Sequence, residues 1–153
     1  MSIKASTVGV ATVTALGVAA LCFALLPKVG DWTANRHAQE ASYATGAEAK
    51  GARTAVPRWL PDNATEVHYR MSTTGGDRLL RAKLPDGRLP AECTAGARGG
   101  EVRLTAAWFP AGAGARATVS CGLYHGLLAG TDFYAWQDDA DWVAANRASA
   151  KAS

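Results

Sequence analysis

Apolar and polar side chains alternate over residues 66–72, and the same period of two returns over residues 78–84. The residues between the runs include the turn Thr74 to Asp77, which contains the pair Gly75-Gly76. Alternation of this kind is typical of a strand with one buried face, and a glycine-rich turn between two such runs is typical of a hairpin. The pattern therefore predicts a β-hairpin over residues 66–84.

Two more runs predict strands that place every second side chain in a core. In residues 101–109 the inward residues would be Val102, Leu104, Ala106 and Trp108. In residues 116–124 they would be Ala117, Val119, Cys121 and Leu123, with Gly122 marking a bulge. Both runs end at glycine- or proline-containing segments, which is how strands in an antiparallel sheet commonly end.

The C-terminal region has two interpretations. Residues 133–137 are rich in aromatic side chains and predict a strand. Residues 138–147 would either return as the second strand of a hairpin, which the aromatic side chains favour, or form a helix capped at Asp138 or Asp139, which the alanines favour. We predict the hairpin and keep the helix as the alternative.

Residues 5–27 contain no charged side chain. As a helix this segment would be about 34 Å long, enough to cross a hydrocarbon core of about 30 Å. We predict a transmembrane helix after a short N-terminal tail (residues 1–4), with the N-terminus inside the cell and the following residues outside. A cleaved secretory signal is the alternative, although the apolar run is longer than a signal core usually is.

Between this segment and the first alternating run lies a polar, alanine-rich region over residues 28–55. Asp31 would cap a helix reaching to about residue 45, and we interpret the whole region as a partly helical stalk. The predicted fold class is therefore α+β. It combines a transmembrane helix, this stalk, a small antiparallel β-rich domain over residues 56–147, and a disordered tail over residues 148–153.

Charge and composition restrict the partners. The 153 residues include 16 Lys and Arg against 13 Asp and Glu, a net charge of +3. Such a small excess does not predict the basic surface of a nucleic-acid-binding protein. The predicted partners are the lipid bilayer, through residues 5–27, and a membrane or envelope protein.

Two cysteines, Cys93 and Cys121, lie outside the apolar segment. In an oxidising compartment a disulfide between them would stabilise a small domain by about 3.5 kcal/mol. Two buried free thiols, or a reactive Cys121 acting with His125, are the alternatives. On a strand, residues four apart are separated by about 13 Å, which is too far for direct proton transfer.

No motif in the sequence indicates a catalytic, cofactor-binding or metal-binding residue, and we predict none. Glu66 and His68 would share a strand face in a geometry compatible with a metal, but a third ligand is missing. Asp138, Asp139 and Asp141 form a local acidic group that a turn or a helix start explains equally well.

The most positive surface that the pattern places is the polar side of the predicted hairpin. Three basic residues outnumber Glu66 there, and a fourth lies at the edge of the turn: Arg70, Arg81, Lys83 and Arg78. If the domain stands just outside an anionic membrane, this surface would contact lipid headgroups. A solvated sheet face is the alternative.

The segment Trp59-Leu60-Pro61, followed by Ala64 and the turn Thr73-Thr74-Gly75, resembles a pattern in small membrane-anchored or exported actinobacterial proteins. The resemblance covers about twenty residues. It implies a lineage and a single anchor, and it implies no catalytic or ligand-binding residue.

These observations lead to one main functional hypothesis: a single-pass membrane protein that displays a non-catalytic accessory or binding domain outside the membrane. The four tryptophans of the domain would contribute either to its core or to a binding surface. A small extracytoplasmic enzyme using Cys121 or His125 is one alternative. A tethered regulatory module facing the cytoplasm is the other.

Overall fold

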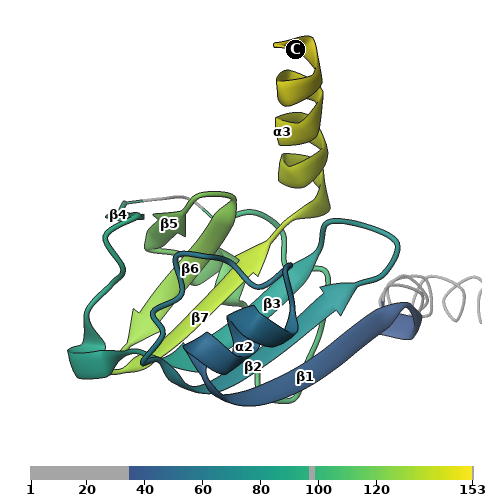
Figure 1. The fold of residues 1–153 in the computed structure, drawn as a ribbon. Coiled ribbons are helices and arrows are strands. Elements are labelled where there is room, and N and C mark those ends of the chain that lie inside the picture. Colours follow the sequence, from purple (N-terminus) through teal and green to yellow (C-terminus); the bar gives the residue numbers. More distant parts are fainter. Residues whose placement is uncertain (1–34, 97–98, 153) are drawn as a thin grey trace, which may run out of the picture.

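The computed structural model describes residues 35–96 and 99–152 of the chain. The strands among these residues form one antiparallel sheet of seven in the order β1-β2-β3-β7-β6-β5-β4 (Figure 1). They are β1 (Ala38–Thr45), β2 (Thr65–Ser72), β3 (Arg78–Lys83), β4 (Cys93–Ala95), β5 (Val119–Cys121), β6 (Tyr124–Ala129) and β7 (Asp132–Gln137). Two α-helices accompany the sheet, α2 (Gly46–Ala52) and α3 (Asp139–Lys151). The prediction of a small antiparallel β-rich domain is confirmed.

The predicted hairpin is present as β2 and β3, which pair antiparallel with Tyr69 opposite Leu80. The side chains of Val67 and Tyr69 are buried on one side of the sheet, as the alternation predicts. The same buried cluster contains Ala49 of α2 together with Val56 and Leu60, which follow this helix. We call this side of the sheet the helix face.

The opposite side of the sheet is covered by residues 99–118, which we call the crossing loop. Leu104 and Ala113 of this loop are buried against Leu79, Leu127 and Trp136 of the sheet. We call this side the loop face. The sheet therefore has a core on each side, one under a helix and one under an irregular segment.

The prediction of a strand over residues 101–109 is wrong, because no residue of this segment belongs to a strand. Its side-chain alternation is nevertheless real. All four residues predicted to point inward lie in or against the core of the loop face: Val102, Leu104, Ala106 and Trp108. An extended segment that lies on a sheet buries every second side chain just as a strand within a sheet does.

The single strand predicted over residues 116–124 is two elements. The chain turns at Gly122, whose φ of 61° is in the left-handed region, and β6 begins directly afterwards. Gly122 therefore ends a strand rather than forming a bulge within one. Leu123, predicted to be buried, is 38% exposed in this turn.

The partly helical stalk predicted over residues 28–55 is wrong for its described part. Residues 38–45, expected to be helix, form β1 and pair with β2 from Ala38 opposite Ser72 to Thr45 opposite Thr65. Thr45 then caps α2, because its hydroxyl accepts a hydrogen bond from the Glu48 N–H (3.2 Å). Pairing with β2 outweighs the helix propensity of this alanine-rich segment, so the domain begins before residue 56.

The hairpin predicted at the C-terminal end is also wrong, and its alternative is correct. Residues 132–137 form β7, and a helix capped by Asp138 follows. This helix, α3, continues to Lys151, so most of the tail predicted to be disordered is helical. Acidic residues in the first turn favour the helix, because they interact with its positive N-terminal end.

The predicted N-terminal tail, the transmembrane helix over residues 5–27 and the start of the stalk lie outside the described residues. Among residues 35–96 and 99–152, no helix has the length and apolar character needed to span a bilayer.

Candidate functional site

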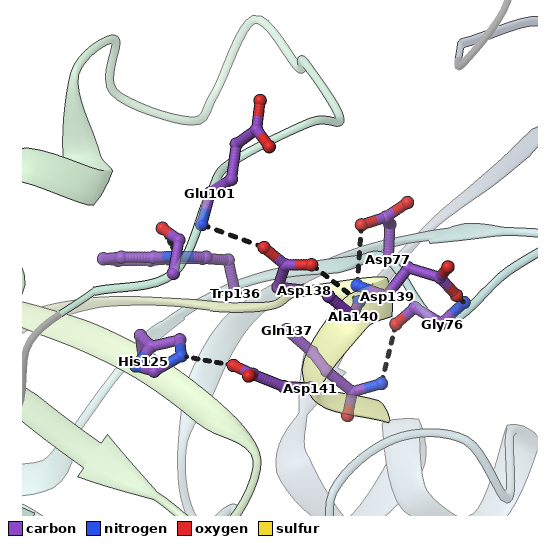
Figure 2. A network of polar contacts seen from close by, with 11 residues as sticks. Gly76, Asp77, Glu101, His125, Trp136, Gln137, Asp138, Asp139, Ala140 and Asp141 are labelled. Atoms are coloured by element: carbon purple, nitrogen blue, oxygen red, sulfur yellow. Dashed lines mark hydrogen bonds and ion pairs between the residues drawn. The ribbon is translucent and has the colours of Figure 1, made fainter. Parts of the chain in front are cut away.

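A network of polar contacts surrounds the junction from which α3 leaves the sheet (Figure 2). Asp138 lies at its centre, between the end of β7 and the start of α3, and is only 7% exposed. One of its carboxylate oxygens accepts a hydrogen bond from the Ala140 N–H (2.7 Å) and the other from the Glu101 N–H (3.0 Å). One carboxylate thus caps α3 and holds the start of the crossing loop.

The turn between β2 and β3 holds the first residue of α3 from the other side. The Asp139 N–H donates to the Asp77 carboxylate (3.0 Å), and the Gly76 N–H donates to the Asp139 carboxylate (2.6 Å). The buried side chain of Gln137 donates to the Gly76 carbonyl (2.6 Å). Burial raises the pKa of the Asp77 carboxyl, and the hydrogen bond from Asp139 partly opposes that rise.

Position 76 accepts only glycine because the indole of α3 lies directly against it. A Cβ atom at Gly76 would be 2.6 Å from the Cβ of Trp142, well inside contact distance. The glycine-rich turn that the sequence assigned to a hairpin therefore has a second role, which is to let α3 approach closely.

A third contact comes from β6, where His125 Nε2 lies 2.9 Å from the Asp141 carboxylate. The His125 ring lies beside the buried Trp136 indole, with ring centroids 6.1 Å apart. The Trp136 indole N–H donates to the Gly100 carbonyl (3.0 Å), which ties the crossing loop to β7. The contacts of Asp138, Asp139 and Asp141 thus connect the base of α3 to three parts of the sheet domain, which are the crossing loop, the β2–β3 turn and β6.

Beyond this base, α3 projects away from the sheet (Figure 1). None of its 13 residues is buried, and Trp142 is 37% exposed. Trp136, by contrast, is fully buried, while Trp59 and Trp108 are half-buried against the two cores. Of the four tryptophans considered as a binding surface, only Trp142 is a substantially exposed large apolar side chain.

Cys93 and Cys121 form a disulfide that joins β4 to β5, where the two residues are paired and their Cα atoms lie 4.2 Å apart. The same register pairs Cys121 with Tyr124 and Ser120 with His125. Since paired residues share a face and neighbours alternate, Cys121 lies on the helix face and His125 on the loop face. The hypothetical Cys121–His125 pair is therefore separated by the sheet.

Of the four basic residues predicted as a surface, three share the loop face: Arg70, Arg81 and Lys83. Arg70, Arg81 and Lys83 are each paired with a carboxylate: Glu40 (2.7 Å), Asp132 (2.9 Å) and Glu66 (2.6 Å), respectively. Arg78 instead shares the helix face with Leu80. These ion pairs offset the positive charge on which the lipid-contact hypothesis rests.

Glu66 and His68, considered as metal ligands, contact other residues instead. Glu66 pairs with Lys83, while His68 Nδ1 lies 2.9 Å from the Ser42 hydroxyl. The His68 ring is stacked on the Trp108 indole, with centroids 5.5 Å apart. Within the described ranges no three His, Cys, Asp or Glu side chains gather in a way that would hold a metal ion.

The middle of the crossing loop is held by Glu40 of β1. One oxygen of its carboxylate accepts from the Trp108 indole N–H (2.6 Å) and the other from Arg70 (2.7 Å). The indole hydrogen bond, followed by the contact with Arg70, lowers the pKa of the Glu40 carboxyl below its usual 4.5.

This arrangement predicts an acid-sensitive contribution to stability. A carboxyl group whose pKa is lower in the folded than in the unfolded state stabilises the fold at pH above its unfolded pKa. That stabilisation is lost as the pH falls through the folded pKa, so we expect part of the free energy of unfolding to disappear below about pH 4.5. Urea unfolding of Glu40→Gln over a pH series should show a shallower acid loss than the native chain. The exposed Glu92→Gln is the control, and equal acid losses in all three proteins would contradict the prediction.

Comparison with known proteins finds no matching family, no similar curated protein and no similar solved structure. The sequence pattern pointed to Asp138 as a helix cap. It gave no signal for Gln137, Asp77 or Glu101, because their contacts join residues at least 37 apart in sequence.

Proposed function

We propose that this chain is a single-pass membrane protein that displays the sheet domain outside the membrane as a non-catalytic binding module. The apolar segment over residues 5–27 supports the anchor. The Cys93–Cys121 disulfide supports an oxidising compartment, because such bonds are rare where cellular reductants keep thiols reduced.

The projecting helix α3 carries the binding part of the proposal. Isolated helices of about 12–15 residues are marginal in water, and most helices in proteins are stabilised by packing one face on a core. α3 has 13 residues and none of them is buried. Its base is fixed by the contacts of Asp138, Asp139 and Asp141, so its direction is set while its sides stay open. A partner that covers α3 would supply the packing that its own domain does not.

A small enzyme built on Cys121 or His125 fits these observations less well. The Cys121 sulfur is bonded to Cys93, and the His125 ring nitrogen Nε2 contacts Asp141 at the base of α3. A thiol count on unreduced protein separates the two hypotheses, because an enzyme using Cys121 requires a free and reactive thiol there.

Site-specific photo-crosslinking in native membranes tests the binding role. A photoreactive amino acid at the exposed Asn146 of α3 should give one discrete adduct whose mass differs from that of a self-dimer. The same photoreactive amino acid at Arg58, an exposed residue before β2, is the matched control and should give no adduct. The absence of an adduct at Asn146, or equal adducts at both positions, would contradict the proposal.

A further inference from the structure

The outermost strand of the sheet, β1, leaves half of its backbone groups unused among the described residues. The His37 carbonyl accepts from the Thr73 N–H (2.7 Å), which shows that odd-numbered residues of this strand face β2. The Ala44 N–H instead donates to the Glu48 carboxylate (2.9 Å), which shows that even-numbered residues face outward. Four residues therefore present an N–H and a C=O away from the sheet, and we call them the open edge: Ala38, Glu40, Ser42 and Ala44.

The open edge has few of the features by which proteins usually prevent strands from pairing, and Glu40 is its single charged side chain. The sequence of β1 is AQEASYAT, without proline or lysine, and its pairing with β2 shows no bulge. Glu48 covers one N–H, at the end of the strand. A strand of eight residues with free groups along one side is a template for another strand.

We propose that the open edge pairs antiparallel with β1 of a second copy of this chain, on a two-fold axis at Ala41. In this register Ala38 lies opposite Ala44 of the second copy, and Glu40 lies opposite Ser42. All four residues of the open edge then find backbone partners, and at Ala44 a carbonyl of the second copy replaces the Glu48 carboxylate as the acceptor of the N–H. An axis at Glu40 would leave Ala44 unpaired and would place two carboxylates opposite each other, which destabilises a strand pair.

Charge at the two ends of β1 supports a second copy as the occupant. The exposed Arg36 and His37 precede the strand, and the exposed Glu48 follows it in α2. An antiparallel pair brings the basic end of one copy to the acidic end of the other, so the edge is complementary to itself. Small side chains let the two backbones approach each other. Ala41 lies on the axis, and three of the four open-edge residues are also small: Ala38, Ser42 and Ala44.

Disulfide trapping in the full chain tests the register. In the proposed pair, Ala41 faces its own copy at a non-hydrogen-bonded position, where Cα atoms are about 4.5 Å apart and a disulfide fits. With Cys22→Ser as background, Ala41→Cys should form a disulfide-linked dimer on mild oxidation. Gln39→Cys is the matched control: it is more exposed, yet its symmetry mate would be about 13 Å away. A failure of Ala41→Cys to link, or equal linking by Gln39→Cys, would overturn the proposal.

Sedimentation analysis tests the edge itself without a crosslink. The Ser42 N–H faces outward, so Ser42→Pro removes an open-edge donor and leaves the hydrogen bonds to β2 in place. Ser42→Ala is the control, because both variants lose the hydroxyl contact with His68. We expect Ser42→Ala to be dimeric and Ser42→Pro monomeric, with circular dichroism showing that both fold. A monomeric native chain, or a dimer that survives in folded Ser42→Pro, would overturn the proposal, and the trapping experiment decides alone if Ser42→Pro does not fold.

Discussion

Replacing Trp136 with alanine is expected to lower the free energy of unfolding by about 3–5 kcal/mol. Trp136 is fully buried on the loop face, where it packs with Leu79 and Leu104. Its indole N–H also holds the Gly100 carbonyl (3.0 Å), so the variant would release the crossing loop as well as leave a cavity.

Trp142→Ala is the matched control, since it removes the same side chain from a position that is 37% exposed. We expect this variant to lose about 1 kcal/mol. Chemical unfolding of the two variants and the native protein measures both values. Equal losses would contradict the placement of Trp136 in the core.

Removing the Cys93–Cys121 disulfide has the second large expected effect. The bond links residues 28 apart in sequence, and the chain-entropy model assigns about 3.5 kcal/mol to a loop of that length. The double variant Cys93→Ser, Cys121→Ser should unfold at a correspondingly lower urea concentration. The unfolding midpoint of Cys22→Ser should equal that of the native protein. An unchanged midpoint in the double variant, or two free thiols in the native protein, would show that the bond does not stabilise the fold.

The parts of the fold that the sequence predicted well are those fixed by local pattern. The β2–β3 hairpin combines alternation with the Gly75-Gly76 turn, and both signals come from residues adjacent in sequence. The cap at Asp138 is also local, and the acidic first turn of α3 was visible. The aromatic side chains nevertheless led to the wrong prediction of a strand over residues 138–147. The aromatic side chains of residues 133–137 belong to β7 and fill the two cores.

The wrong predictions involve segments whose structure depends on distant partners. β1 has good helix formers and few apolar residues, and its partner residues in β2 lie twenty or more residues further along the chain. The crossing loop shows the reverse case, since its alternation is that of a strand although it belongs to none. Alternation reports which side chains are buried, and it does not report whether the backbone is paired.

The α3 junction was largely invisible in sequence for the same reason. Asp77 and Gly76 contact Asp139 and Gln137 across more than sixty residues, and no local signal connects them. The Cys93–Cys121 pairing was accessible because only two cysteines lie outside the apolar segment.

We propose that the sheet domain stands outside the membrane with α3 open to a partner. Labelling of intact cells with a membrane-impermeant maleimide tests it most directly, using Lys151→Cys at the exposed end of α3 and Ser2→Cys before the apolar segment, each in a Cys22→Ser background. We expect Lys151→Cys to be labelled as fully in intact cells as after lysis, Ser2→Cys to be labelled only after lysis, and the bonded Cys93 and Cys121 to stay unlabelled. Labelling of Lys151→Cys only after lysis would place the domain inside the cell and contradict the proposal.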